Sequence, residues 1–414
     1  MNADTRQQAD TSAMAGPHSP VVLVTNTHAG HANGATPAEL LRAAGIVVAE
    51  QIDVSVLDHN LPRGVRWREA GMRATVAAGG DGTLGAVASQ LVGSGLPMGI
   101  LPMGTSNDSA RSLGVPLDLT AASEVIAWGL PTPVDAGQAL PALTEPGALS
   151  PTHAAHIPAD EAALNTTLAG QGAYFMHALT LGLNVEFARL ATDVARRERW
   201  GTLTYAASAL EALAQFQPVP VTLRLFGVVR QGADGDLVEK GGDVIIMRRA
   251  LQVAVVNLPV FGGPLNLRLP NAWLGDSLLD FVVIEALEPP NLRATVDGLF
   301  AALGRLRDGV FSGRAAPSEG APAEGAAASA EASEELTDES AGLALPGVHR
   351  YSARSAVIET PSDVDVTLDG EIRTRTPVRV RVAPERVQVL LPKEVRDRLL
   401  ERERARNRRS AAER

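Results

Sequence analysis

The sequence contains no cysteine and almost no lysine. Of its 37 basic residues only two, Lys240 and Lys393, are lysines. Without cysteine the chain can form no disulfide, no thiolate nucleophile and no Cys-ligated zinc or iron–sulfur site. Neither lysine stands in the Gly-Lys-Ser/Thr context of a Walker phosphate loop, or in the strand context of a protein-kinase lysine. A nucleotide would therefore have to be bound by backbone N–H groups, arginines, hydroxyl groups and a metal ion.

Long apolar runs are also missing. No run approaches the roughly 18 residues that a membrane-spanning helix needs. Residues 1–20 are polar and lack the apolar core of a secretory signal, so we interpret them as a disordered tail. These features favour a cytoplasmic protein that can still act at the inner face of a membrane.

The net charge of -10 argues against a nucleic-acid partner, which normally meets a basic surface. The charge is segregated, however. Residues 315–349 contribute -7 and have few apolar anchors, which predicts a disordered linker. Residues 393–414 contribute +4 and are expected to form a basic helix. A solvated helix is the simpler interpretation of this segment, and attraction to anionic lipid headgroups is the alternative.

Strand-like and helix-like segments alternate four times in residues 21–137. Val21–Thr25 is a short apolar run of the kind that forms a buried parallel strand. Thr36-Pro37-Ala38-Glu39 carries the signature of a capping box, and the helix that it opens should end near Gly45. Such alternation is typical of a doubly wound parallel sheet. We therefore predict an α/β domain, suited to binding a nucleotide, in this part of the chain.

The pattern changes after residue 137. Repeated prolines interrupt residues 138–172, which we interpret as an inserted loop. Residues 173–392 hold β-like segments rich in Val and Leu and bounded by turn residues, which predicts a mainly antiparallel second domain interrupted by the linker. One apolar segment at 174–181 begins this domain, and four short strands between 354 and 391 are expected to pair into its sheets.

A glycine-rich motif, Gly79-Gly80-Asp81-Gly82-Thr83, follows a buried strand and opens a helix. Its N–H groups and the positive end of the helix can bind phosphate, Thr83 can cap the helix or touch phosphate, and Asp81 can organise magnesium through water. A structural turn explains this motif equally well on its own. A second motif, Leu101–Asp108, stands at the end of the next strand. Neighbouring parallel strands end at one crevice, where α/β sheets bind ligands.

The two motifs together, extended by residues 110–116, resemble the lipid kinase family that contains diacylglycerol, sphingosine and ceramide kinases and the bacterial diacylglycerol kinase-like proteins. The first motif is shared with NAD kinases. The similarity covers most of residues 21–137, 173–310 and 350–392. Asn26-Thr27, Gly85-Ala86 and Asp276-Ser277 stand where the family usually has Asn-Pro, Asn-Glu and Asp-Gly.

The resemblance implies ATP and Mg²⁺ as cofactors and assigns roles to particular residues. Asp369 matches the acid proposed as proton acceptor for the lipid hydroxyl, with Glu371 beside it; from the residues alone, Asp369-Gly370 would be interpreted as a hairpin turn. The residues implied around ATP are Asn26, Gly30, Gly79, Gly80, Asp81, Gly82, Thr83, Gly104, Thr105, Asn107 and Asp108. Those implied for magnesium are Asp81, Asp108 and Asp135 in one water network, and Asp276 with the carbonyl group of Leu278 at a separate structural site.

The resulting prediction is an ATP- and Mg²⁺-dependent lipid kinase that phosphorylates a hydroxyl group of diacylglycerol or a related lipid in phospholipid biosynthesis. Two alternatives stay open: a kinase of a soluble substrate, similar to NAD kinase, and a non-catalytic lipid or nucleotide sensor on a decayed kinase scaffold. The expected partners are the lipid substrate and a membrane surface, without nucleic acid. The oligomeric state is open, and a dimer is compatible with the sequence.

Overall fold

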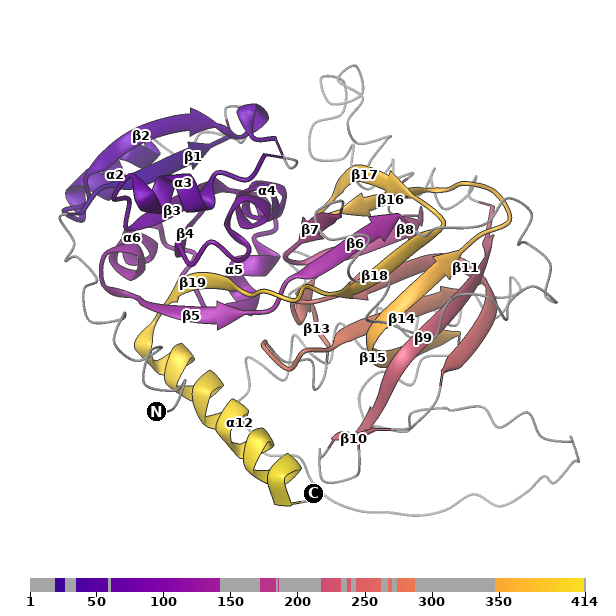
Figure 1. The fold of residues 1–414 in the computed structure, drawn as a ribbon. Helices are drawn as coiled ribbons and strands as arrows, with labels where there is room; N and C mark the ends of the chain where they lie inside the picture. Colours follow the sequence, from indigo (N-terminus) through magenta and orange to yellow (C-terminus); the bar gives the residue numbers. More distant parts are fainter. Residues whose placement is uncertain are drawn as a thin grey trace, which may run out of the picture.

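The computed structural model consists of two domains that lie side by side (Figure 1). It describes residues 19–26, 35–58, 61–141, 172–183, 185, 217–231, 237–239, 243–261, 267–269, 274–286 and 347–412. The sequence also predicts helices at 203–216 and 291–307. These two segments, and the linker as far as residue 346, lie outside the described residues.

The first domain contains a six-stranded sheet in the order β2-β1-β3-β4-β19-β5. Its neighbours pair in parallel except for β5, which is antiparallel to β19. Every residue of β3 and β4 is buried, as the short apolar runs indicated. The predicted α/β class is confirmed. The strands are β1 (Val21–Thr25), β2 (Val48–Asp53), β3 (Ala74–Gly79), β4 (Met98–Pro102), β5 (Leu130–Val134) and β19 (Val387–Leu391).

The helices of the first domain pack in two groups, α2 with α6, and α3 and α5 with α4. The predicted capping box opens α2: Thr36 Oγ1 accepts a bond from Glu39 N at 3.3 Å, and Thr36 N donates to Glu39 Oε2 at 2.8 Å. Gly45, with a φ of 78°, follows the end of the helix. The helices are α2 (Pro37–Ala43), the short 3₁₀ helix η1 (Val54–Val56), α3 (Gly64–Glu69), α4 (Asp81–Leu91), α5 (Asp108–Ser112) and α6 (Leu119–Trp128).

The second domain is built from antiparallel strands, as predicted. β9 pairs with both β11 and β15, and β14 joins β11 to β15, so these four strands close on themselves around a core that includes Phe175 and Phe281. Its strands are β6 (Gly137–Pro141), β7 (Ala173–Phe175), β8 (Ala178–Gly182), β9 (Val219–Gln231), β10 (Leu237–Glu239), β11 (Val244–Val256), β14 (Leu279–Glu285), β15 (Val348–Glu359), β16 (Asp365–Leu368), β17 (Glu371–Arg375), β18 (Val378–Val382) and the small pair β12 (Val260–Phe261) and β13 (Leu267–Arg268).

Two predicted boundaries between the domains are wrong. Residues 138–141, assigned to the inserted loop, belong to β6, which pairs with β18 and buries Ala139 in the second core. Residues 142–171 of that loop lie outside the described part of the chain. β19, predicted in the second domain, instead enters the first domain between β4 and β5, because Val387, Val389 and Leu391 bury there.

Three further differences concern the second domain. β17 was missed because its residues, Glu371-Ile372-Arg373-Thr374-Arg375, are mostly exposed and carry little apolar pattern. The segment at 174–181 is not one strand but two, β7 and β8, separated at Met176-His177. The assignment of Val348 and His349 to the linker is wrong, because both lie in β15.

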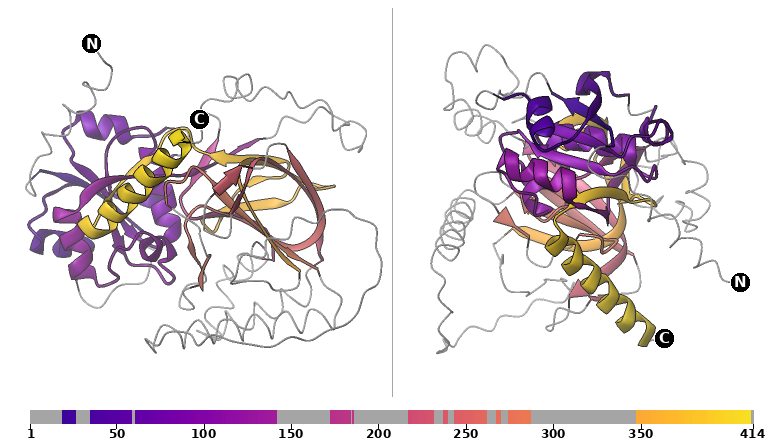
Figure 2. Two further views of the ribbon diagram at one scale, coloured as in Figure 1. Left: turned by 90° about the horizontal axis from the view of Figure 1, so that it is seen from below. Right: turned by 90° about the vertical axis from the view of Figure 1, so that its left-hand side faces the viewer.

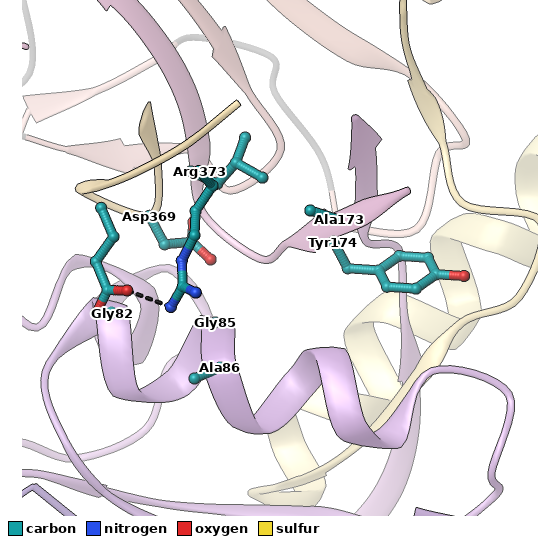
Figure 3. Close-up of a pocket in the computed structure, with 9 residues that line it drawn as sticks. Gly82, Gly85, Ala86, Ala173, Tyr174, Asp369 and Arg373 are labelled. Atoms are coloured by element: carbon teal, nitrogen blue, oxygen red, sulfur yellow. Dashed lines mark hydrogen bonds and ion pairs between the residues drawn. The ribbon is translucent and has the colours of Figure 1, made fainter. Parts of the chain in front are cut away.

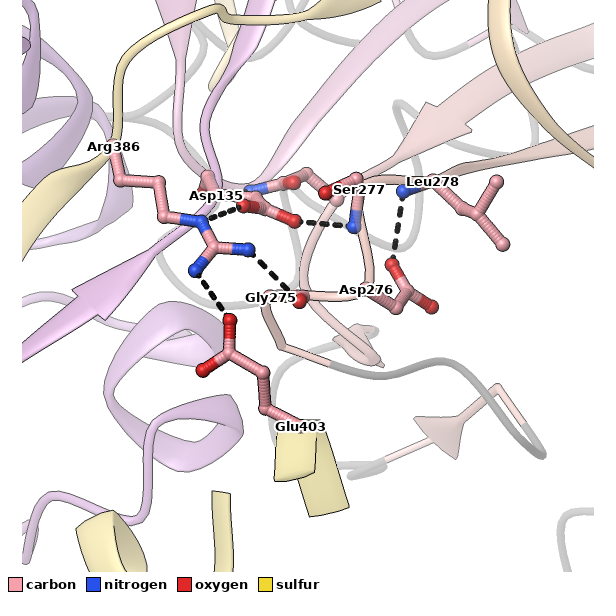
Figure 4. A network of polar contacts seen from close by, with 8 residues as sticks. Asp135, Gly275, Asp276, Ser277, Leu278, Arg386 and Glu403 are labelled. Atoms are coloured by element: carbon pink, nitrogen blue, oxygen red, sulfur yellow. Dashed lines mark hydrogen bonds and ion pairs between the residues drawn. The ribbon is translucent and has the colours of Figure 1, made fainter. Parts of the chain in front are cut away.

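Arg386 ties the domains together where the chain crosses between them. Its Nε donates to Asp135 Oδ1 at 2.7 Å, while Ser277 N donates to Asp135 Oδ2 at 2.6 Å (Figure 4). The same guanidinium also donates to Gly275 O at 3.1 Å and to Glu403 Oε1 at 2.9 Å. One arginine thus joins the end of β5, the loop before β14 and the C-terminal helix.

That helix, α12 (Lys393–Ala412), confirms the predicted helix at the basic end. Its first half packs Val395 and Leu399 against the first domain, and its second half extends beyond the body of the molecule (Figure 2). Among the helices that the structure describes, none combines the length and apolar content needed to cross a bilayer.

Candidate active site

The two glycine-containing motifs touch through their backbones. A Cβ atom on Gly104 would lie 2.3 Å from the Cα atom of Gly80, so the approach requires glycine at 104. Asn107, in the left-handed region with a φ of 51°, holds this loop: its Oδ1 accepts from Gly104 N at 2.9 Å and its Nδ2 donates to Gly104 O at 2.8 Å. The structure therefore brings the two predicted phosphate-binding loops together at the ends of β3 and β4.

Asp81 links these loops. Its carboxylate accepts bonds from Asp108 N at 3.2 Å and Ser109 N at 2.7 Å, at the beginning of α5. A helix N-terminus favours a negative charge, which fixes Asp81 beside Asp108. Asp108 is itself buried, with its carboxylate 3.8 Å from the Arg111 guanidinium.

The other predicted nucleotide residues that the structure describes lie at or near the ends of β1, β3 and β4. Thr83 does not cap α4: the N-cap is Gly80, and Thr83 is buried in the first turn against Gly79. Thr105 is exposed in the loop after β4, and Asn26 follows β1. Gly30 lies outside the described residues.

Asp369 lies in the turn between β16 and β17. Asp369 and Gly370 have φ values of 49° and 88°, as a two-residue hairpin turn requires, so the hairpin interpretation is confirmed. The Asp369 carboxylate accepts three backbone bonds, from Met176 N and His177 N at 2.8 Å and from Ala178 N at 3.0 Å. The break between β7 and β8, together with the first residue of β8, thus supplies the N–H groups that fix this carboxylate.

Burial raises the pKa of Asp369 from 3.8 to about 6. The three backbone N–H donors and the nearby His177 favour the ionised form and act in the opposite direction, but desolvation is the larger effect. At neutral pH the carboxylate is therefore ionised and more basic than an exposed aspartate. This pKa suits a general base near neutral pH.

The Asp369 hairpin of the second domain rests on α4 of the first. A Cβ atom on Gly85 would lie 2.0 Å from Asp369 Oδ2, and one on Gly82 would lie 3.4 Å from Glu371 Oε1. A pocket of about 270 Å³, including the part open to solvent, lies at this contact (Figure 3). Its lining residues are Gly82, Gly85, Ala86, Ala173, Tyr174, Leu368, Asp369, Glu371 and Arg373.

The predicted magnesium ligands are only partly brought together. Asp81 and Asp108 are neighbours, with both Asp81 carboxylate oxygens accepting backbone bonds from Asp108 N and Ser109 N. Both carboxylate oxygens of Asp135 are bound by Arg386 and Ser277. At the structural site, Asp276 Oδ1 accepts from Leu278 N at 3.0 Å. Within the described ranges no group of three or more His, Asp or Glu side chains is arranged to hold a metal ion. The three-acid network and the separate structural site stay predictions.

Several residues of the site carry no motif. Met176, His177 and Ala178 act through backbone N–H groups, and His177 is a polar residue within a mostly apolar segment. Gly85 could be singled out only as a departure from Asn in the family pattern. Arg373 lies on β17, whose residues show little apolar pattern.

Each domain matches a known protein family. Residues 20–139 match the family described as "Diacylglycerol kinase catalytic domain", and residues 178–312 match the "YegS C-terminal NAD kinase beta sandwich-like domain". A protein of Mycobacterium tuberculosis named "Diacylglycerol kinase" is 25% identical over 382 residues, covering 90% of this chain and 95% of its own.

Two further similarities agree. A "Probable lipid kinase YegS-like" of Klebsiella pneumoniae is 38% identical over 109 residues, covering 25% of this chain and 37% of its own. A crystal structure titled as a putative diacylglycerol kinase from Bacillus anthracis superposes with a TM-score of 0.53 at 18% identity, covering 93% of this chain and 99% of that one. The last comparison shows a shared fold.

Proposed function

Because the chain belongs to the family of diacylglycerol kinase-like and YegS-like lipid kinases, we propose that it transfers the γ-phosphate of ATP to a hydroxyl group of diacylglycerol or a related lipid. One observation carries the proposal. The Asp369 hairpin meets α4 at Gly82 and Gly85. A carboxylate with a raised pKa from one domain therefore lies beside the proposed phosphate-binding loop, residues 79–83, of the other domain.

In the proposed reaction the triphosphate lies at the Gly80–Gly104 contact, and the acceptor hydroxyl donates its hydrogen bond to Asp369. The acceptor oxygen forms a bond to the γ-phosphorus while the bond from that phosphorus to the β–γ bridging oxygen breaks. Asp369 takes the hydroxyl proton, and ADP leaves. Because the transition state is loose, proton removal is late and the carboxylate mainly orients the hydroxyl group.

The donor set fits a magnesium ion that binds together with the nucleotide. Mg²⁺ at such sites commonly takes one or two carboxylates and the phosphates of the substrate, so Asp81 and Asp108 suffice without a third acid. Their carboxylates lie in the two loops that would hold the phosphates. When bound, the ion neutralises charge on the phosphate oxygens.

The test is incubation of the purified protein with [γ-³²P]ATP, Mg²⁺ and a fractionated lipid extract, followed by identification of the labelled lipid. Asp369→Asn, which keeps the side-chain shape, should reduce labelling by about 10²- to 10⁴-fold. Unchanged labelling by this variant would reject Asp369 as the base. A parallel incubation replaces the lipid extract with NAD. Labelling of NAD but not of lipid would reject the lipid acceptor, and labelling of neither would favour the sensor alternative.

A further inference from the structure

Arg373 is the one basic residue among those that line the pocket beside Asp369. Its side chain extends from β17 toward the turn of α4 that holds Gly82 and Gly85 (Figure 3). Its guanidinium Nη2 donates to Glu371 Oε2.

The surroundings of Arg373 are unusually acidic for a place that should receive phosphate. Glu371 lies against Gly82, within the phosphate loop, and the Asp369 carboxylate lies against Gly85. Two carboxylates beside a triphosphate are unfavourable unless a cation stands between them and the phosphate oxygens. Arg373 is already held at this position by Glu371.

The chain offers no lysine for this task within the described residues. Lys393 begins α12 outside the pocket, and Lys240 lies outside the described part of the chain. A planar guanidinium can satisfy two anions at once because its five N–H groups point in fixed, divergent directions. Glu371 can therefore retain one edge of Arg373 while the other edge remains able to bind phosphate oxygens.

Resting on the proposed kinase function, we propose that Arg373 binds the terminal phosphate of ATP and neutralises the charge of the phosphoryl group as it passes to the acceptor. Glu371 acts as its positioning residue. Arg373 forms and breaks no covalent bond: the phosphoryl group moves from the bridging oxygen to the acceptor oxygen, and the proton goes to Asp369.

The test compares Arg373→Gln with Arg375→Gln. Arg375 is a matched control because it lies two residues along the same strand, pairs with Asp365 and does not line the pocket. Affinities for ATP and for ADP are measured by calorimetry with Mg²⁺ present. We expect Arg373→Gln to weaken ATP binding about tenfold with ADP binding nearly unchanged, and Arg375→Gln to change neither by more than about twofold.

The kinetic arm measures kcat with the lipid that becomes labelled. Arg373→Gln should reduce kcat by about 10³-fold or more, within the range for arginines that stabilise phosphoryl transfer, and Arg373→Lys should recover part of this loss. The same ATP-to-ADP preference in both variants would overturn the proposal. If no lipid is labelled at all, the kinase proposal fails, while the nucleotide affinities still decide whether Arg373 meets the terminal phosphate.

Discussion

The carboxylate of Asp369 lies in the space that a side chain at Gly85 would occupy. A Cβ atom there would be 2.0 Å from Asp369 Oδ2. In this chain the close approach of the proposed base to α4 depends on glycine, at a position where the family pattern usually has Asn. The absence of a side chain at position 85 therefore explains how the Asp369 carboxylate can approach α4 so closely.

Replacement of Gly85 by Ala should therefore be harmful. Alanine normally stabilises an α-helix interior by about 1 kcal/mol relative to glycine. Here we expect the overlap with Asp369 to reverse the sign, with a loss of about 1–3 kcal/mol in the free energy of unfolding and a reduced kcat. Urea unfolding and steady-state kinetics provide the measurements. In an Asp369→Ala background the same substitution should cost less, and equal costs in both backgrounds would argue against the contact.

The activity should depend on the ionisation of Asp369. Burial raises its pKa to about 6, and a general base must be ionised, so kcat/KM should rise with pH and reach half its plateau near pH 6. The charged or titratable groups around Asp369 are Glu371, Arg373 and His177. The Asp369→Asn variant retains all three, so it serves as the control for their ionisation. A wild-type profile without this limb would contradict the assignment.

The same shift predicts the sign of a stability effect. Because the folded pKa exceeds the value of 3.8, this group stabilises the fold most below about pH 4, and the contribution is lost as pH rises through about 6. A shift of about two units corresponds to about 3 kcal/mol. The unfolding free energy of the wild type, relative to Asp369→Asn, should fall by an amount of this order between pH 4 and pH 7 in chemical denaturation.

Removal of Arg386 should destabilise the protein more than removal of its partner on α12. Arg386→Gln leaves the carboxylate of Asp135, whose side chain is 4% exposed, without its cation, which should cost about 3–5 kcal/mol. Glu403→Gln breaks a contact between side chains that are 27% and 32% exposed, and should cost about 1 kcal/mol or less. Guanidinium unfolding measures both. If both variants lose the same unfolding free energy, the contact of Arg386 with Glu403 on α12, and not its contact with Asp135, provides the stabilisation.

Helix α12 should attract anionic membranes. Its exposed arginines include Arg398, Arg404 and Arg408. At about 1 kcal/mol for each basic residue near a charged surface, their joint replacement by Gln should weaken binding to phosphatidylserine vesicles by up to about 10²-fold. Co-sedimentation at low and high salt tests this, with phosphatidylcholine vesicles as the control. Equal binding of wild type and variant would reject a membrane role for the helix.

Features that depend on local sequence could be predicted. The capping box at Thr36 and Glu39 and the two glycine motifs are read from consecutive residues, and the structure contains them as expected. β17 and the position of β19 could not be predicted, because they depend on which distant strand offers a partner.

The candidate site divides in the same way. Asp81 and Asp108 stand in motifs, whereas the three N–H groups that fix Asp369 belong to Met176, His177 and Ala178, whose side chains do not reveal them. The Arg386–Asp135 pair likewise joins residues far apart in the chain, each without a distinctive neighbourhood in sequence.

The position of β19 has a consequence for biosynthesis. In the six-stranded sheet, β19 lies between β4 and β5 and is the one strand that pairs with both. During translation the ribosome completes β1 to β5 long before it makes Val387–Leu391. The strand position between β4 and β5 therefore stays unfilled until nearly all of the second domain has emerged. The two domains are therefore expected to mature together, and a fragment ending at residue 137 would expose the edges of β4 and β5 to aggregation.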